Sequence, residues 1–214
     1  MSIEAKPATR STVDPAALDW SKGGGLLPVI VQDARNLRVL MLGYMNLDAY
    51  RATLQLGKVT FFSRSKQRLW TKGETTGHVL QVVSIDVDCD QDTLLVQAIP
   101  HGPTCHLQRP SCFADAPSDF LSELDALVES RHRARPEGSY TTKLFDDGVR
   151  RIAQKVGEEG VETALAGVAQ DDAALLGEGA DLLFHLTVLL RARGLSLAEA
   201  VAVLRARHQL AEHG

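Results

Sequence analysis

Three cysteines lie close together in the chain, and their number and spacing favour a metal site. Cys89, Cys105 and Cys112 fall within 24 residues, and the sequence has no other cysteine. A cluster of this kind points first to metal binding or catalysis. Structural zinc sites normally have four protein ligands, so three thiolates suit a catalytic zinc whose fourth position holds water. Zinc can lower the pKa of that water to about 7.

Three aspartates next to the first cysteine could hold a second ion. On an extended strand Asp86, Asp88 and Asp90 would share one face, and Cys89 would point to the other. A hard cation such as Mg²⁺ suits three carboxylates on one face. The stretch is not an EF-hand, because Gln91 stands where that loop requires glycine. A solvated Asp-rich turn and three free buried cysteines remain open alternatives, so residue chemistry alone predicts a metal site and no particular reaction.

The surrounding motifs resemble a known enzyme family. The segment SRSKQRLWTKGETTGHVLQVVSIDVDCDQDTLLVQAIPHGPTCHLQRPSCF is similar to phosphoribosyl-AMP cyclohydrolase, and the likeness covers about residues 26–113. It implies a homodimer in which Cys89 of one chain joins Cys105 and Cys112 of the other around zinc. It also implies Mg²⁺ held by Asp86, Asp88 and Asp90. The sequence departs from the family at His78, where members often carry asparagine.

The resemblance implies a hydrolytic ring opening. In phosphoribosyl-AMP the ribosyl group on N1 makes C6 of the adenine electron-poor, so water activated by zinc can attack C6 and the N1–C6 bond opens. His106 adjoins a proposed ligand and is placed to move protons, although a surface histidine is the alternative. Lys72, Gly73, Glu74, Thr75 and Thr76 are predicted to contact the phosphoribosyl group. Arg64 and Lys66 could add phosphate contacts, with solvated surface charge as the alternative.

A second group of acidic residues occupies the C-terminal half. Glu159 and Glu162 lie on adjacent turns of an expected helix, with Glu158 four residues before Glu162. Glu178 and Asp181 repeat the three-residue spacing on the next helix. One such pair is most simply a solvated acidic face. Two pairs on consecutive apolar helices can instead aim four carboxylates into one groove and hold Mg²⁺.

This half resembles a different enzyme family. SYTTKLFDDGVRRIAQKVGEEGVET and LLGEGADLLFHLTVLL are similar to phosphoribosyl-ATP pyrophosphohydrolase over about residues 118–210. The likeness implies Mg²⁺ bound by Glu158, Glu159, Glu162, Glu178 and Asp181. Lys143 and Lys155 would face the triphosphate while water attacks the α–β linkage, and His185 would pack nearby. The product of this reaction is the substrate of the other one.

The elements that must position these residues change character near the third cysteine. Strands are expected at 26–34, 37–45, 59–64, 78–88 and 93–99. A helix at 47–56 begins at the cap Asn46 and ends at Gly57. Helices are then expected from about 120, from 141 through the ExxE motif, over 173–193, and after a capping box of Ser196 and Glu199.

We therefore predict an N-terminal arm over residues 1–25, which includes a short helix capped by Asp14. A mostly β, dimeric α+β domain follows over 26–113, and an all-α helical bundle of the nucleotide pyrophosphohydrolase type over 114–214. No apolar run reaches the roughly 20 residues of a membrane span, and no signal peptide is evident, so a cytoplasmic protein is expected. The resemblance to two dimeric families implies a homodimer.

Charge and motifs limit the alternatives. Residues 1–112 carry 12 Lys or Arg against 10 Asp or Glu, and residues 113–214 carry 11 against 17, so neither half is basic enough for nucleic acid. One rival is a general nucleotide pyrophosphohydrolase with a degenerate N-terminal domain, which the intact cysteines disfavour. Another is a structural zinc module with a helical dimerisation domain, which the paired carboxylates disfavour, since converging acids do not stabilise an interface.

Overall fold

The protein divides into two compact units. The computed structural model describes residues 13–212, and contacts separate Met1–Asp119 from Phe120–Gly214. The first unit is mostly β-sheet with one α-helix, and the second is all helical, as predicted. The division falls after Asp119, later than the boundary expected after residue 113.

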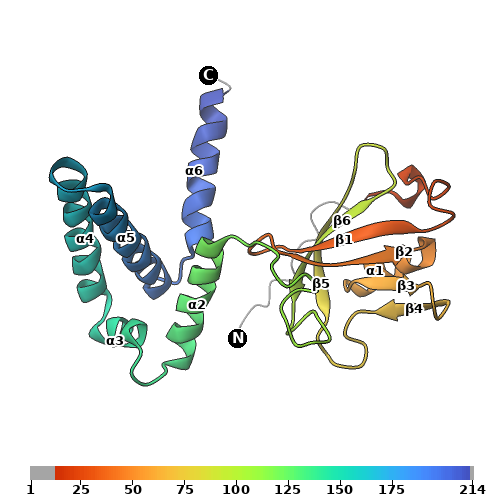
Figure 1. The fold of residues 1–214 in the computed structure, drawn as a ribbon, viewed down its shortest axis with the longest axis horizontal. Coiled ribbons are helices and arrows are strands. Elements are labelled where there is room, and N and C mark those ends of the chain that lie inside the picture. The colour runs from red at the N-terminus through yellow and green to blue at the C-terminus, as the bar shows by residue number, and fades with distance from the viewer. Residues whose placement is uncertain (1–12, 213–214) are drawn as a thin grey trace. The chain divides into compact units, whose positions relative to one another are not determined.

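The N-terminal unit contains a four-stranded and a two-stranded sheet (Figure 1). The larger sheet has the order β2-β1-β6-β5, with β1 and β6 parallel and its other pairs antiparallel. Its strands are β1 (Leu27–Asp33), β2 (Val39–Met45), β5 (Leu80–Val87) and β6 (Leu94–Pro100). The smaller sheet pairs β3 (Thr60–Ser63) with β4 (Arg68–Thr71), and α1 (Leu47–Leu56) precedes it.

Alternating burial explains why these segments form strands. In β1 and β6 buried residues alternate with half-buried ones, so one face of each strand enters the core. The fully buried residues of this core include Leu27, Val29, Tyr50, Ile85 and Leu94, so α1 and β5 contribute to it as well. The caps expected for α1 are confirmed: Asn46 Oδ1 accepts a 2.8 Å hydrogen bond from Ala49 N–H, and Gly57 has φ 64°.

Two features of this unit differ from the expectation. Strand β4 was not predicted, because Arg68 and Leu69 are exposed and show no buried alternation. Residues 13–25 are also more than an arm. The helix expected at the cap Asp14 is confirmed as the 3-10 helix η1 (Pro15–Ala17), but Leu18, only 5% exposed, belongs to the hydrophobic core of this unit. The first twelve residues of the predicted arm lie outside the described part of the chain.

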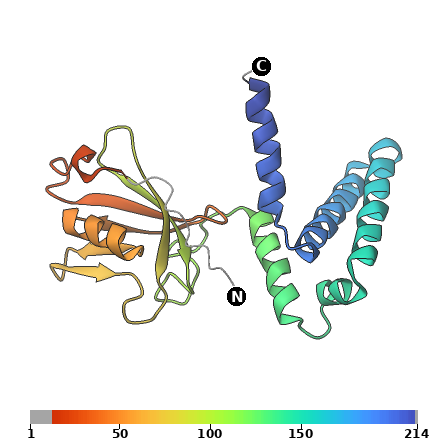
Figure 2. The same ribbon diagram turned by 180° about the vertical axis from the view of Figure 1, so that it is seen from behind.

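The C-terminal unit consists of helices. They are α2 (Phe120–Ala134), α3 (Tyr140–Asp147), α4 (Val149–Ala169), α5 (Asp172–Ala192) and α6 (Leu197–Glu212). Helices α4 and α5 run side by side in both views (Figure 1, Figure 2), and α2 packs on α3 and α5. The predicted capping box of α6 is confirmed, because Glu199 Oε2 accepts from Ser196 N–H at 2.7 Å and Ser196 Oγ accepts from Glu199 N–H at 3.2 Å.

The expected single helix beginning near residue 141 is two helices. Gly148 separates α3 from α4 with φ 86°, a left-handed value that ends a helix and that residues other than glycine rarely adopt. The apolar spacing continued across Gly148, so periodicity alone did not reveal the break.

Many apolar side chains of this unit remain exposed. Among the described residues, the buried members of its core cluster are Val128, Leu144, Phe145, Ile152 and Val188. Exposed apolar side chains include Val161, Leu165 and Val168 on α4, Leu176 on α5 and Leu204 on α6. Among the described helices, α5 is long and apolar enough to cross a membrane by length and composition, a test that a core helix also passes.

Candidate active sites

A cavity of about 320 Å³ in the N-terminal unit brings together most of the predicted cyclohydrolase residues. Its lining includes two of the three cysteines, Cys105 and Cys112, and the neighbouring His106. The segment 72–76, predicted from the sequence to contact the phosphoribosyl group, forms another part of the wall. Trp70, His78, Thr104 and Gln108 also line the cavity. Residues more than thirty positions apart thus face one space.

Backbone geometry holds the Lys72–Thr76 segment at this wall. Gly73 has φ 85°, and a Cβ there would lie 2.4 Å from the carbonyl of His78, so only glycine fits. Arg68 donates a 2.7 Å hydrogen bond to Glu74 Oε1, and this guanidinium is the first cause of the lowered pKa of Glu74. Glu74 thereby fixes the turn, since its other oxygen accepts from Thr71 N–H. Sequence reasoning missed Arg68.

The two cavity cysteines differ in acidity. The backbone N–H of Leu107 donates to the Cys105 sulfur and lowers the pKa of that thiol, while partial burial opposes this and Arg109, 3.9 Å from Sγ, adds to it. Partial burial raises the pKa of Cys112, and the negative charge of Cys105 raises it further. The two sulfurs are therefore near neighbours with one thiolate favoured, a donor pair suited to a soft metal ion.

Cys89 does not line this cavity. It is exposed in the turn after β5, which ends at Val87, one residue before the predicted end at Asp88. The cause is local: Asp88 Oδ1 accepts hydrogen bonds from the N–H groups of Asp92 and Thr93, both 3.0 Å, which closes a turn. Partial burial opposes the ionisation of Asp88, but these N–H donors lower its pKa overall.

The turn also regroups the aspartates. Asp88, Asp90 and Asp92 have carboxylate oxygens within 4.8 Å of one another, whereas the predicted set contained Asp86 in place of Asp92. Asp86 lies on β5 and is exposed, outside this group. Lys22 neutralises part of the cluster, with Nζ 2.9 Å from Asp90 and 3.4 Å from Asp92. Strand alternation was the wrong geometry for residues in a turn.

The remaining predicted residues of this domain are placed unevenly. His106 Nδ1 lies 3.9 Å from Cys105 Sγ, in reach of a group bound in the cavity. Arg64 does not line the cavity, and its guanidinium stacks 3.8 Å from the centre of the Tyr44 ring. Lys66 also lies outside the lining.

Two residues near the cysteines were not predicted from the sequence. Arg109 Nε and Thr104 Oγ1 are buried and have no hydrogen-bond partner among the described residues.

The carboxylates of the C-terminal unit converge between α4 and α5. Glu159, Glu178 and Asp181 offer oxygens within 4.8 Å of one another, and Glu159 is only 5% exposed. Desolvation raises the pKa of Glu162, and the negative charges of Glu159 and Glu178 raise it further. Four carboxylates therefore repel one another across two helices, which is the arrangement that a divalent cation relieves.

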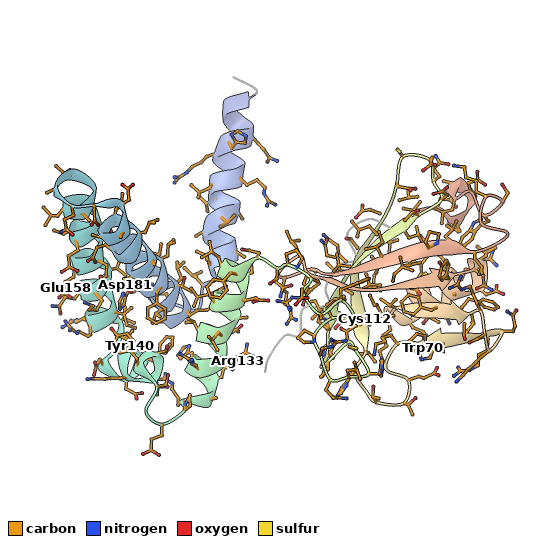
Figure 3. The ribbon with its side chains drawn as sticks, in the orientation of Figure 1. Trp70, Cys112, Arg133, Tyr140, Glu158 and Asp181 are labelled. Atoms are coloured by element: carbon orange, nitrogen blue, oxygen red, sulfur yellow. The ribbon has the colours of Figure 1, made fainter. Side chains whose placement is uncertain are left out.

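Lysine 155 lies beside this cluster, and Glu158 is turned to other partners. Lys155 Nζ is 2.7 Å from Glu159 and 2.9 Å from Glu158, and Glu159 is the first cause of its raised pKa. Glu158 also accepts a 2.7 Å hydrogen bond from Gln154. Figure 3 labels Glu158 on α4 and Asp181 on α5. The structure thus groups Glu159, Glu178 and Asp181, with Glu162 near them and Glu158 paired with cations.

Lys143 belongs to a different hollow. It lines a surface cavity of about 680 Å³ at the start of α3, together with Arg135, Tyr140 and Thr142. Tyr140 connects this cavity to the acidic cluster, because its hydroxyl lies 3.1 Å from His185 Nε2. His185 itself is buried, 4% exposed, and packs beside Glu159.

Fold and sites together define a two-domain hydrolase of phosphoribosyl nucleotides. The phosphoribosyl-AMP cyclohydrolase family model matches residues 41–114, and the phosphoribosyl-ATP pyrophosphohydrolase model matches residues 121–208. The chain belongs to the family of bifunctional histidine biosynthesis proteins HisIE. It is an enzyme of histidine biosynthesis with a cyclohydrolase and a pyrophosphohydrolase domain.

Its relatives match almost end to end. The HisIE protein of Xanthomonas axonopodis pv. citri is 74% identical over 200 residues, which are 93% of this chain and 97% of the relative. That of Xylella fastidiosa strain Temecula1 is 71% identical over 204 residues, 95% and 98% of the two chains. That of Escherichia coli K12 is 59% identical over 194 residues, 90% and 96%.

Proposed function

We propose that the N-terminal domain opens the adenine ring of phosphoribosyl-AMP, and that the C-terminal domain produces this compound by releasing pyrophosphate from phosphoribosyl-ATP. The observation that supports the first assignment most directly is the shared cavity of Cys105, Cys112 and Lys72–Thr76. It combines two soft metal ligands with a cation and hydroxyls, which suit a phosphorylated substrate.

The donor set fits zinc if a second copy of the chain completes it. Cys105 has a lowered thiol pKa and Cys112 lies beside it, whereas Cys89 is exposed elsewhere on the domain. Cys89 of a second copy would supply the third thiolate and leave one position open. A zinc ion bound there supplies a Lewis acid that lowers the pKa of a water molecule.

The chain's own residues bind the nucleotide and move protons. Lys72 and the hydroxyls of Thr75 and Thr76 hold the phosphoribosyl group, in a turn kept in shape by Arg68 and Glu74. His106 lies near the Cys105 sulfur and can pass a proton to the ring nitrogen that leaves C6. Arg64 and Lys66 add positive charge outside the cavity wall, where they favour the approach of an anionic substrate.

The C-terminal carboxylates fit magnesium. Glu159, Glu178 and Asp181 converge, and repulsion raises the pKa of Glu162, so a cation has oxygen ligands from both helices. Glu158 belongs to the same acidic face and would join after release from Lys155. Magnesium bound there offsets the charge of the triphosphate. Lys155 and Lys143 supply further positive charge to the triphosphate.

The aspartates after β5 form a further acidic group suited to Mg²⁺. Asp86, Asp88 and Asp90 remain the proposed set, and Asp92 joins the proposal because within one chain the carboxylate oxygens of Asp88, Asp90 and Asp92 lie within 4.8 Å of one another, whereas Asp86 lies on β5. Lys22 supports the turn from the side of η1, since its Nζ also donates to the Asp90 carbonyl at 3.1 Å. A cation would have to compete with this ammonium group for Asp90 and Asp92.

We also propose that the enzyme is a cytoplasmic homodimer that binds neither nucleic acid nor membrane. The separation of Cys89 from Cys105 and Cys112 supports a second copy, and so do the exposed apolar side chains of α4 and α5. A membrane would be a poor partner for α5, because Glu178 and Asp181 lie on it among the apolar residues. Light scattering after gel filtration tests the dimer, and a monomer at micromolar concentration contradicts it.

The function is tested by following two products separately. Full-length enzyme with Zn²⁺ and Mg²⁺ receives phosphoribosyl-ATP, and pyrophosphate and the ring-opened product are both measured. We expect Cys105→Ala to abolish ring opening and retain pyrophosphate release, and Glu162→Gln to impair pyrophosphate release while ring opening of added phosphoribosyl-AMP continues. If either substitution removed both activities in a folded protein, the assignment of one reaction to each domain would be wrong.

A further inference from the structure

A buried histidine joins three helices next to the acidic cluster. His185 on α5 is 4% exposed, and its Nδ1 lies 2.9 Å from the carbonyl oxygen of Asp181 and 3.7 Å from Glu159 Oε1 on α4. Its Nε2 lies 3.1 Å from the hydroxyl of Tyr140, the first residue of α3. One imidazole ring therefore contacts α3 and both helices that carry the carboxylates.

The partners of the ring determine the direction of each hydrogen bond. The Asp181 carbonyl can only accept, so Nδ1 carries the hydrogen that is donated to it. In the neutral ring Nε2 is then an acceptor, and the Tyr140 hydroxyl donates to it. A ring held at both nitrogens cannot turn, and its edge forms a fixed wall against Glu159.

Packing and hydrogen bonding can be separated at Tyr140. Its ring stacks on Phe184 with centroids 6.2 Å apart and an interplanar angle of 24°, and the ring edge meets His185. Loss of the hydroxyl alone leaves both ring contacts and removes only the donor to His185. Figure 3 labels Tyr140 at the start of α3 and Asp181 on α5, the helices that this contact connects.

We propose that Tyr140 and His185 are positioning residues that hold Glu159 and the Asp181 turn in the geometry that binds the divalent cation. The proposal rests on the proposed function of the acidic cluster as a cation site. The two residues act through the carboxylates and donate nothing to the substrate. Groups that orient metal ligands through a second set of contacts commonly change metal affinity about 10-fold or more when removed.

The test measures cation binding to the full-length, metal-free protein, with Mn²⁺ as probe and titration calorimetry as readout. We expect Tyr140→Phe and His185→Asn to weaken Mn²⁺ binding about 10-fold, as positioning contacts do. In the pyrophosphate assay the Mg²⁺ concentration for half-maximal rate should rise while kcat at saturating Mg²⁺ stays near that of the wild type. A purely structural role would not produce that split.

Thr187→Val is the matched control. It removes one hydroxyl from α5, where the buried Thr187 donates to the Leu183 carbonyl at 2.8 Å and takes no part in the Tyr140–His185 contact. It should bind Mn²⁺ like the wild type. Equal weakening by Thr187→Val, or wild-type affinity in Tyr140→Phe, overturns the positioning role even if His185→Asn misfolds. If Glu178→Gln binds Mn²⁺ as the wild type does, the proposed cation site itself fails.

Discussion

Arg191 on α5 donates two hydrogen bonds of 2.6 Å, from Nε and from an Nη atom, to the two carboxylate oxygens of Asp125 on α2. The pair is largely shielded from water, with side-chain exposures of 18% and 7%. The same carboxylate accepts from the backbone N–H of Leu197 at the start of α6. One ion pair thus joins three helices of a unit whose apolar core is small.

Arg191→Ala should destabilise the C-terminal domain. The substitution leaves Asp125 buried without its cation, which costs about 3 kcal/mol of unfolding free energy. Urea unfolding of the full-length protein measures this with two probes. Circular dichroism follows mainly the helices, whereas both tryptophans, Trp20 and Trp70, lie in the N-terminal unit and report on it by fluorescence. Only the transition followed by circular dichroism should shift to lower urea.

The control is Arg133→Ala, an arginine at the surface of α2 (Figure 3). Its side chain is 77% exposed and pairs with Glu129, so its loss should change stability by less than about 0.5 kcal/mol. Equal effects of the two substitutions would show that Asp125 gains nothing from its buried partner.

Gly43→Ala should destabilise the other domain. Gly43 lies on β2, and a Cβ there would stand 2.4 Å from the Phe61 ring, which is 2% exposed and stacks on Trp70. Overpacking of this kind costs about 1–3 kcal/mol. The fluorescence transition should move to lower urea, and Gly43→Ala with Phe61→Leu should regain part of the loss. A double variant no more stable than the single one contradicts the steric explanation.

Local signals predicted much of this structure. Asn46 and Gly57 fix α1, Ser196 and Glu199 start α6, and alternating apolar residues define β1 and β6. These elements follow from interactions within a few residues. The break between α3 and α4 was not predicted, because the apolar spacing continues without interruption across Gly148.

The candidate sites were harder to predict, because they bring together residues that are far apart in the sequence. Cys105, Cys112 and the Lys72 segment could be assigned to one site only through the family motifs, since no periodicity relates them. The regrouping of Asp92 with Asp88 required the hydrogen bonds of one turn. Arg68 gave no distinctive pattern, and its role follows from a side-chain contact between elements. His185 was expected to pack near the acidic residues, but its contact with Tyr140 on another helix was not predictable from spacing.

His132 should make the C-terminal domain less stable in mild acid. Burial lowers the pKa of His132 in the folded protein, and the nearby charge of Arg135 lowers it further. Between the folded and unfolded pKa values the unfolded chain binds more protons, so stability rises with pH. The contribution of His132 to the free energy of unfolding is therefore fully present above the ordinary histidine pKa of 6.5, and it is lost as the pH falls below that value.

His132→Phe removes this titration and keeps a ring to stack on Phe145, from whose centroid the imidazole is 4.1 Å. Melting followed by circular dichroism at about pH 5.5 and about pH 7.5 compares the two proteins. The wild type should lose more stability in acid than the variant does, because all other titrating groups are shared. The same loss in both would contradict a role for His132.

Subunit complementation should show whether one zinc site uses two chains. Cys89→Ser and Cys105→Ser chains each lack ring opening as homodimers if all three thiolates bind the metal. A heterodimer of the two variants, isolated with two affinity tags, combines the intact Cys89 of one chain with the intact Cys105 and Cys112 of the other. By two-fold symmetry one of its two sites is complete, so ring opening should return to about half of the wild-type rate.

A heterodimer of Cys105→Ser and Cys112→Ser chains is the control. Each chain then lacks one of the two cysteines that share a cavity, so both sites stay incomplete and ring opening should stay absent. Pyrophosphate release measures the amount of intact enzyme in every preparation, because its carboxylates lie in the other unit. If all three ligands came from one chain, the Cys89→Ser and Cys105→Ser heterodimer would be as inactive as this control, and a site shared between subunits would be excluded.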